Sequence, residues 1–325
     1  MNSVRYILVL SILCLLFPWG SAEAGEKIRI AVISDINGRY GTTKYNERVA
    51  AAVTHIIALN PDLVISTGDM VAGQRPHPRL TTAELEGMWR SFHATVRQPI
   101  QQAGIPLVMT PGNHDASAYP GFELERAAYT RYHTDFPPAL MPEISGHFPY
   151  HYALEHPGIL LVSLDATTRG KLVNNQLPWL TDLLRSADAY RAVVLFGHLP
   201  LQAVAIGREL DVVSDPELEA LLSEGKATVY LSGHHHAYYP GHRLGMDMLS
   251  IGNLGGNQRR LVGSNMTTGF SFVMLEIDNA NSLSISAFTP PAFEQAIDID
   301  ALPAKIGSGI HRLTRRDLAS KSDGN

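Results

Sequence analysis

The strongest constraint on the fold is a regular alternation, in the first part of the chain, between short apolar runs and longer stretches of helical spacing. Apolar runs that predict buried strands occupy residues 28–34, 62–67 and 105–110. Stretches with helical periodicity separate them at residues 45–59 and 82–103. Strands that alternate with helices in this way are joined by right-handed crossovers and lie parallel in one sheet. The order therefore predicts an α/β fold.

The rest of the chain continues this alternation and then becomes rich in strands. Strands are predicted at residues 150–154, 159–164, 192–196, 228–232, 247–252, 270–277 and 282–288, with a helix at residues 177–186. Because no Ser/Gly-rich linker divides the chain, we expect residues 25–303 to form one domain. Residues 116–149, rich in aromatic side chains, proline and histidine, are interpreted as a lid-like insertion. The polar residues 304–325 are interpreted as a flexible tail.

The N-terminus has the features of an export signal. Arg5 precedes an apolar run at residues 7–17, and a small-x-small cleavage pattern ends at Ala24. We expect residues 1–24 to be removed and the mature protein to be periplasmic or secreted, with no transmembrane segment after cleavage; an uncleaved membrane anchor is the alternative. The only cysteine, Cys14, lies in this signal, which excludes disulfides, a thiol nucleophile and Cys-ligated zinc from the mature chain.

Charge and histidine content narrow the function further. The formal net charge is −5, so we expect no broad attraction to nucleic acid polymers. The chain has 14 histidines, several of them beside Gly, Asn or Asp in predicted loops, where imidazoles can converge on a metal. With no thiol in the mature chain, the chemistry must use His, Asp, Asn and water.

Polar side chains recur at one position, the carboxyl end of a predicted strand. Five segments share it: Asp35-x-Asn37, Gly68-Asp69, Gly112-Asn113-His114-Asp115, Gly197-His198 and Gly233-His234-His235-His236. Open α/β sheets bind ligands at this edge because their loops gather there. The glycines let the backbone turn sharply, so that short side chains reach into a cleft. The pattern predicts a site made of Asp, Asn and His side chains.

In this order the five segments resemble the calcineurin-like metallophosphoesterase family, whose pattern is D-x-H, GD, GNH[DE], GH and GHxH. The resemblance spans residues 30–236. It implies a four-layer α/β-β/α sandwich in which two mixed β-sheets are flanked by helices. It also implies two divalent metal ions (manganese, iron or zinc), and such a pair can activate water and hold phosphate oxygens for in-line attack.

For the first metal ion, the resemblance implies Asp35, Asp69 and His236 as ligands, with Asn37 standing where the family usually has histidine. An amide oxygen is a weaker and harder donor than imidazole, so we expect looser binding there, or a preference for manganese or magnesium over zinc. The alternatives are that Asn37 contacts the substrate, or that Asp35 and Asn37 only cap a turn.

For the second metal ion, the resemblance implies Asp69 as the bridging ligand, completed by Asn113, His198 and His234. His234 and His236 are two residues apart, so an extended backbone would aim both imidazoles at one face. The histidine between them would then point the other way.

Two branches of the family are disfavoured. Residues 70–73 follow Asp69 without the second Asp and the Arg that serine/threonine protein phosphatases have there. Purple acid phosphatases place a tyrosine ligand where this chain has Ala72. The chain is therefore interpreted as similar to the bacterial phosphodiesterase and nucleotidase branches.

The expected activity is hydrolysis of phosphodiester or phosphomonoester bonds in small molecules, nucleotide-like or phospholipid head-group esters. His114 is not a ligand in the family and would stand beside the leaving group as proton donor or charge stabiliser. The alternative is a non-catalytic protein that keeps the fold and binds a metal or a phosphate ligand. Neither the oligomeric state nor the native metal pair follows from the sequence.

Overall fold

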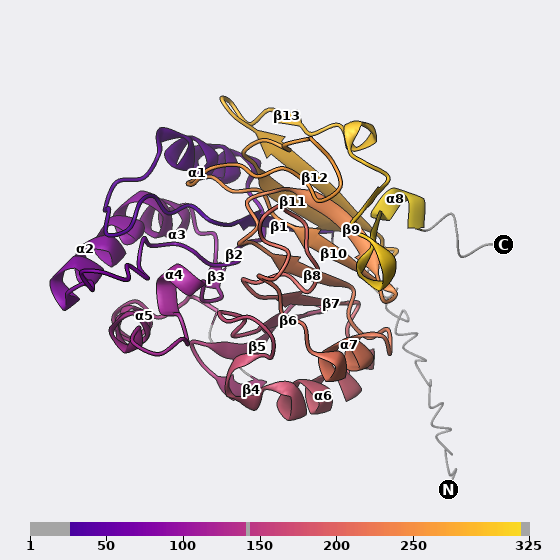
Figure 1. Cartoon of the computed structure of the whole chain (residues 1–325), viewed down its shortest axis with the longest axis horizontal. Helices are drawn as coiled ribbons and strands as arrows, with labels where there is room; N and C mark the ends of the chain where they lie inside the picture. The colour runs from indigo at the N-terminus through magenta and orange to yellow at the C-terminus, as the bar shows by residue number, and fades with distance from the viewer. Residues whose placement is uncertain (1–26, 141–143, 320–325) are drawn as a thin grey trace, which may run out of the picture.

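The computed structural model describes residues 27–140 and 144–319. The predicted signal peptide, residues 1–24, lies outside the described residues. Two β-sheets pack face to face and helices cover their outer faces, which gives four layers (Figure 1). The predicted fold class, two mixed sheets flanked by helices, is confirmed.

The first sheet has the strand order β13-β12-β11-β1-β2-β3. Its strands are β1 (Ile28–Ile33), β2 (Leu63–Ser66), β3 (Leu107–Met109), β11 (Phe272–Ile277), β12 (Leu283–Thr289) and β13 (Gln295–Ala296). β1, β2 and β3 are parallel, as the alternation predicts, whereas β11 runs antiparallel to β1 and makes the sheet mixed.

The second sheet has the order β14-β15-β9-β10-β8-β7-β6-β5-β4. Its strands are β4 (Ile144–His147), β5 (His151–His156), β6 (Ile159–Ser163), β7 (Ala192–Phe196), β8 (Val229–Ser232), β9 (Tyr239–Arg243), β10 (Met246–Ser250), β14 (Lys305–Ile306) and β15 (Leu313–Arg315). β6, β7, β8 and β10 form its parallel centre.

The helices lie outside the two sheets (Figure 1). They are α1 (Glu47–Leu59), α2 (Thr82–Phe92), a π-helical turn (His93–Arg97), α3 (Gln98–Gln102), α4 (Asn113–Ala116), α5 (Glu123–Asp135), α6 (Leu177–Arg185), α7 (Pro216–Leu222) and α8 (Arg316–Ala319), with 3-10 turns at Val173–Asn175, Ala187–Ala189, Ile299–Ala301 and Gly309–His311. Within the described part of the chain, none of them combines the length and apolar character needed to cross a membrane.

Local sequence explains where the first two helices begin and end. Asn46 accepts a hydrogen bond from a backbone N–H in the first turn of α1 and so caps its start. Asn60 ends α1 in the left-handed conformation with φ 48°, directly before Pro61, which cannot continue a helix. Thr81 and Glu84 form a reciprocal capping box at the start of α2.

Alternation along the strands divides the interior into three apolar layers. In β1, Ile30 and Val32 point between the two sheets, whereas Ala31 and Ile33 point toward α1 and its neighbouring helices. The same alternation in β7 separates the layer between the sheets from the layer under α6 and α7. Each fully buried aliphatic side chain contributes about 1.5–3 kcal/mol, so both faces of each central strand stabilise the fold.

The predicted flexible tail is wrong for residues 304–319. β15 pairs with β9 at the edge of the second sheet, and Leu313 is buried in its apolar core. The guanidinium of Arg315 is buried and bonded to Asp300 at 2.9 Å and Asp317 at 2.7 Å. The polar composition of residues 304–319 predicts a solvated segment. The structure differs because the charges of Arg315, Asp300 and Asp317 neutralise one another. Residues 320–325 lie outside the described part.

Residues 116–140 belong to the helical layer rather than to a separate lid, and residues 144–147 form β4 at the edge of the second sheet. α5 packs against α2, with the rings of Trp89 and Tyr132 stacked 4.5 Å apart. Tyr129 is fully buried in the same apolar cluster. Tyr129 and Tyr132 are therefore core residues, whereas Tyr119 and Phe136 are exposed. Residues 141–143 lie outside the described part.

Candidate metal centre

Five loops, each following the carboxyl end of a strand, bring the polar residues together. The loops after β1, β2 and β3 come from the first sheet, and those after β7 and β8 come from the second. The carboxylate of Asp35, after β1, accepts the backbone N–H of His234, after β8, at 2.9 Å. This bond joins the two sheets at the site. The predicted convergence of the five segments is therefore present.

Asp115 fixes two of these loops against each other. Its Oδ1 accepts the backbone N–H groups of Met70 and Val71 at 2.8 and 2.9 Å, and its Oδ2 accepts that of Gly112 at 2.8 Å. The carboxylate lies fully buried behind Asp69. The last residue of the Gly-Asn-His-Asp motif thus orients the loop that carries Asp69.

Gly112 is required by the close approach of these loops. A Cβ at this position would lie 2.1 Å from the backbone nitrogen of Asp69 and 2.2 Å from its carboxylate. Gly68, opposite it, has φ +101°, a conformation that favours glycine. Both glycines therefore allow the loops after β2 and β3 to touch where Asp69 enters the site.

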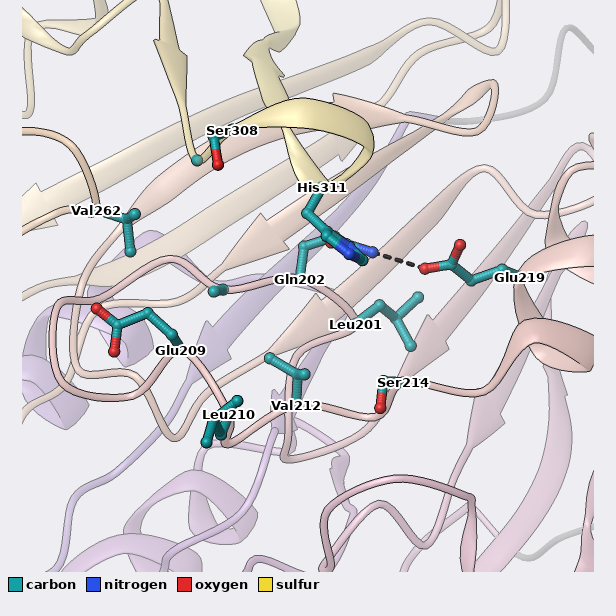
Figure 2. Close-up of a pocket in the computed structure, with 12 residues that line it drawn as sticks. Leu201, Gln202, Glu209, Leu210, Val212, Ser214, Glu219, Val262, Ser308 and His311 are labelled. Atoms are coloured by element: carbon teal, nitrogen blue, oxygen red, sulfur yellow. Dashed lines mark hydrogen bonds between the residues drawn. The ribbon is translucent and has the colours of Figure 1, made fainter.

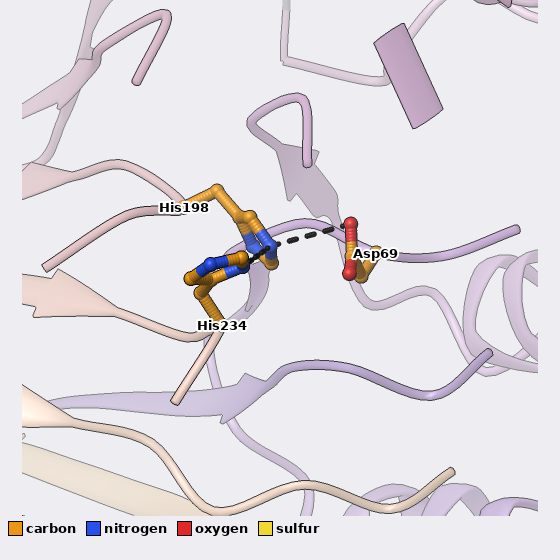
Figure 3. A group of neighbouring side chains, drawn as sticks. All are labelled: Asp69, His198 and His234. Atoms are coloured by element: carbon orange, nitrogen blue, oxygen red, sulfur yellow. Dashed lines mark hydrogen bonds and ion pairs between the residues drawn. The ribbon is translucent and has the colours of Figure 1, made fainter. Parts of the chain in front are cut away.

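Asp69, His198 and His234 form a compact group in which one ligand atom from each lies within 4.8 Å of the others (Figure 3). His198 Nε2 is 3.3 Å from Asp69 Oδ1 and 3.3 Å from His234 Nδ1. The Nδ1 of His198 is 2.9 Å from the carbonyl oxygen of Thr67, to which its N–H donates. This bond leaves the Nε2 lone pair directed at the group, the tautomer a metal ligand needs.

Asn113 completes this group with a buried oxygen that lacks a partner. Its Nδ2 donates to Gln74 Oε1 at 2.6 Å, whereas its Oδ1 has no hydrogen-bond donor among the described residues. A buried acceptor without a donor is unfavourable by about 1–3 kcal/mol. A divalent cation held by Asp69, His198 and His234 would satisfy it, so the residues present fit a metal ion.

Asp35 and His236 form a second pair beside the first group. His236 Nε2 lies 3.1 Å from Asp35 Oδ1, and its Nδ1–H donates to the carbonyl of Asn257 at 2.8 Å. Asn37 is nearly buried, and its Nδ2 donates to the carbonyl of Val71 at 3.3 Å. The Oδ1 of Asn37 is therefore the atom left for a metal or a substrate. Ligation by these residues stays a prediction.

A family model described as calcineurin-like phosphoesterase matches residues 28–238. The chain belongs to this family. Its members are metal-dependent phosphoric ester hydrolases with a dinuclear centre, and the two neighbouring donor groups described above agree with such a centre.

Individual relatives are distant. Purple acid phosphatase 22 of Arabidopsis thaliana is 26% identical over 227 residues, which cover 68% of this chain and 47% of the relative. The chain thus spans about half the length of this curated relative. The solved structure of GAP50, the anchor in the inner membrane complex of Plasmodium, has 12% identity and a TM-score of 0.53, covering 82% of this chain and 85% of that chain. This likeness shows the fold alone.

A dimetal phosphatase from Danio rerio is also similar, with 12% identity, a TM-score of 0.48, and coverage of 79% of this chain and 98% of that chain. In this chain, Ala72 is buried and offers no side-chain oxygen where purple acid phosphatases have their tyrosine ligand. The sequence similarity to a purple acid phosphatase therefore does not extend to that ligand.

Electrostatics at the candidate metal centre favour bound positive charge. Burial alone would raise the pKa of Asp69, but the charges of His198 and His114 outweigh it and lower that pKa to about 2. Burial likewise opposes ionisation of Asp35, but His236 and His198 hold its pKa well below the usual range. Burial would lower the pKa of His198, yet Asp69 and Asp35 raise it to about 9. A divalent cation can take the place of these protons.

The backbone around the last motif differs from the expected one. β8 ends at Ser232, and His234 and His236 have φ values of 65° and 50°, so they lie in a left-handed turn rather than an extended strand. Both imidazoles still face the site. The intervening His235 points away, as predicted, and its Nδ1 accepts the backbone N–H of Val204 at 3.1 Å.

His114 stands at the edge of the metal group. The Nδ1–H of its ring donates to the carbonyl of Gly73 at 2.8 Å, and its Nε2 is 3.8 Å from Asp69 Oδ2. The exposed ring of Tyr40 lies against it, with ring centroids 5.3 Å apart. His114 is therefore partly exposed at the site, and its role as a proton donor stays a prediction.

A cavity of about 510 Å³ opens in front of the metal group. It is lined by Asn37, Gly38, Arg39, Tyr40, Asp69, Gln74, Asn113, His114, Arg208, His234, His236, Gly256 and Arg259. Another cavity, of about 370 Å³, lies around Leu201, Glu209 and His311 and shares no lining residue with the first (Figure 2). Only the first one is at the metal group.

Sequence reasoning missed three polar residues at this site. Asp211 Oδ2 lies 3.7 Å from the Nε2 of His234, and Arg208 pairs with Asp211 at 2.6 Å. Arg259 donates to the carbonyl oxygen of His234 at 3.4 Å. None of the three belongs to a motif or follows a strand directly, so only a tertiary contact could reveal them.

Proposed function

We propose that this chain is an exported metal-dependent phosphoesterase that hydrolyses phosphodiester or phosphomonoester bonds of small molecules. The observation that carries the proposal is the buried group of Asp69, His198 and His234, with the unpaired oxygen of Asn113 beside it and an open cavity in front. A cavity of about 510 Å³ suits a small ligand rather than a polymer.

The residues divide into metal-holding and substrate-facing groups. Asp69, Asn113, His198 and His234 would hold one divalent ion, and the pair of Asp35 and His236 would provide for a second with Asp69. Two such ions, when bound, polarise the phosphoryl group and lower the pKa of water.

The protein's own part is to fix geometry and move a proton. His114, oriented through its Nδ1–H, presents its Nε2 toward the cavity, where a protonated imidazole can give its proton to the leaving oxygen. Asp115 keeps the loops of Asp69 and His114 in register, so the donor lies at a fixed distance from the metal group.

Export is proposed on the N-terminal sequence alone. An apolar run at residues 7–17 followed by a small-x-small pattern is typical of a cleaved signal. A periplasmic or secreted enzyme of this kind would release phosphate from extracellular esters.

The proposal is tested with the purified chain lacking residues 1–24. We expect hydrolysis of p-nitrophenyl phosphate, bis-p-nitrophenyl phosphate or both, abolished by EDTA and restored by manganese or zinc. His198→Gln should reduce turnover by about a hundredfold or more, since it removes a ligand. His77→Gln, at an exposed loop position, is the matched control. No turnover of either ester with any metal would instead favour the non-catalytic binding protein.

A further inference from the structure

The cavity in front of the metal group is lined by more positive than negative side chains. Arg39, Arg208 and Arg259 line it, and they come from three segments of the chain far apart in sequence. Asp69, a predicted metal ligand, is the only carboxylate among the described lining residues. Among the described residues, the lining therefore carries more positive than negative side chains.

Of the three arginines, Arg259 is the partly buried one whose charge has no counterion among the described residues. It is partly buried, and its Nη1 donates to the carbonyl oxygen of His234 at 3.4 Å. Among the residues the structure describes, it makes no ion pair. Arg208 differs, because its guanidinium pairs with Asp211 at 2.6 Å. Arg39 is exposed to solvent.

Arg259 lies beside the metal group, because it lines the same cavity as Asp69 and its Nη1 donates to the backbone of His234. Burial, then the nearby charge of Arg208, lower the pKa of Arg259, while Asp35, Asp211 and Asp69 act in the opposite direction. A partly desolvated cation is unfavourable until an anion pairs with it. Guanidinium binds phosphate oxygens in a bidentate, charge-assisted way, so phosphate is the anion that fits this position.

Resting on the proposed phosphoesterase function, we infer that Arg259, supported by Arg208, is a specificity residue that selects doubly charged phosphomonoesters over singly charged phosphodiesters. A monoester carries close to two negative charges above pH 7, because its second pKa is near 6. A diester carries one, and its second substituent removes an oxygen that Arg259 would bind. The guanidinium therefore stabilises the monoester more.

The ratio of the two activities tests this assignment. In the manganese-loaded protein at pH 8, Arg259→Gln should lower kcat/KM for p-nitrophenyl phosphate by about tenfold or more, since charge-assisted hydrogen bonds are among the stronger ones. Activity on bis-p-nitrophenyl phosphate should change less than about threefold, and Arg259→Lys should recover part of the monoester rate. Arg260→Gln is the matched control, because Arg260 is the next residue but is exposed and does not line the cavity.

Equal losses on both esters, or no loss on either, would overturn the inference. Binding of inorganic phosphate, measured by calorimetry on the protein as purified, separates it from the proposed function. Weaker phosphate binding by Arg259→Gln than by wild type and Arg260→Gln supports the anion site even if no ester is turned over. Equal phosphate affinity in all three proteins refutes it, whereas a wild type without turnover on either ester refutes the phosphoesterase proposal.

Discussion

At the scale of single residues, Asn37 is the position where this chain departs from its family's pattern. Its Nδ2 donates to the carbonyl oxygen of Val71, which leaves its Oδ1 for a metal or a substrate, and Asn37 and His236 both line the cavity. Imidazole is a better donor than an amide oxygen for zinc. We expect Asn37→His to bind zinc about tenfold more tightly and to keep activity, as measured by metal titration and ester turnover. Unchanged affinity would show that Asn37 is not a ligand.

Asp211 gives a second prediction at this scale. Its Oδ2 lies 3.7 Å from Nε2 of His234, whose Nδ1 faces His198. The carboxylate favours the proton on Nε2 and leaves Nδ1 free to bind a metal, as carboxylates behind metal-bound histidines do. Asp211→Asn should weaken metal binding by about tenfold.

Metal titration of Asp211→Asn beside Asp182→Asn, a change on an exposed helix surface, checks this. Asp211 also pairs with Arg169 and Arg208, so the melting temperature of the metal-free protein is measured alongside. A lower melting temperature with unchanged metal affinity would assign Asp211 to loop stability only.

The sequence could predict the residues that follow strands, but not those that reach the site from elsewhere. Asp35, Asp69 and His198 occupy strand ends, where a motif and a strand pattern agree. Asp211 and Arg259 lie in irregular segments between β7 and α7 and after β10. Nothing in their neighbours along the chain distinguishes them from solvated charges. Their role depends on which loops meet in space.

At the scale of elements, two glycines in different settings give opposite predictions. A Cβ at Gly112 would meet the backbone of Asp69 at 2.1 Å, so Gly112→Ala must separate the loops after β2 and β3. A Cβ at Gly87, within α2, would meet nothing closer than 3.7 Å. We expect Gly112→Ala to lose metal binding and turnover, and Gly87→Ala to raise the free energy of unfolding by about 1 kcal/mol with activity unchanged.

Urea unfolding and metal titration of both variants test this pair. A Gly112→Ala protein with normal metal affinity would show that the two loops can separate without moving Asp69. A Gly87→Ala protein that is less stable than wild type would contradict the open space at this position in α2.

Elements with strong periodicity were predictable and those made by long-range pairing were not. The prediction for β7 matches the structure at both ends, and α1 and α6 differ from prediction by one or two residues at an end. β9, β14 and β15 escaped prediction because β14 and β15 are short, β9 contains Pro and Gly, and β9 and β15 pair with each other although they are far apart in the sequence. Periodicity cannot report such pairing.

At the scale of the whole molecule, stability should depend on the neutral state of histidines buried away from the metal group. His133 lies in α5, almost fully buried, and its Nδ1–H donates to the carbonyl of Tyr129 at 3.0 Å. Burial lowers the pKa of His133 to about 4. Partial burial lowers the pKa of His151 and of His156 in the same direction.

The sign of the effect follows from which state binds the proton. Between about pH 6.5 and the folded-state pKa of His133, about 4, the unfolded chain binds a proton that the folded chain does not. Stability therefore falls on acidification through this window, by about 2 kcal/mol from His133 alone between pH 6.5 and 5. We expect His133→Gln to flatten this acid dependence by about that amount in urea unfolding, with His77→Gln as the exposed control. A variant whose stability falls with acid as steeply as that of wild type would show that His133 does not cause the loss of stability. The loss would then come from His151, His156 and the site carboxylates Asp35 and Asp69. The lowered folded-state pKa values of these two carboxylates also make stability fall toward acid.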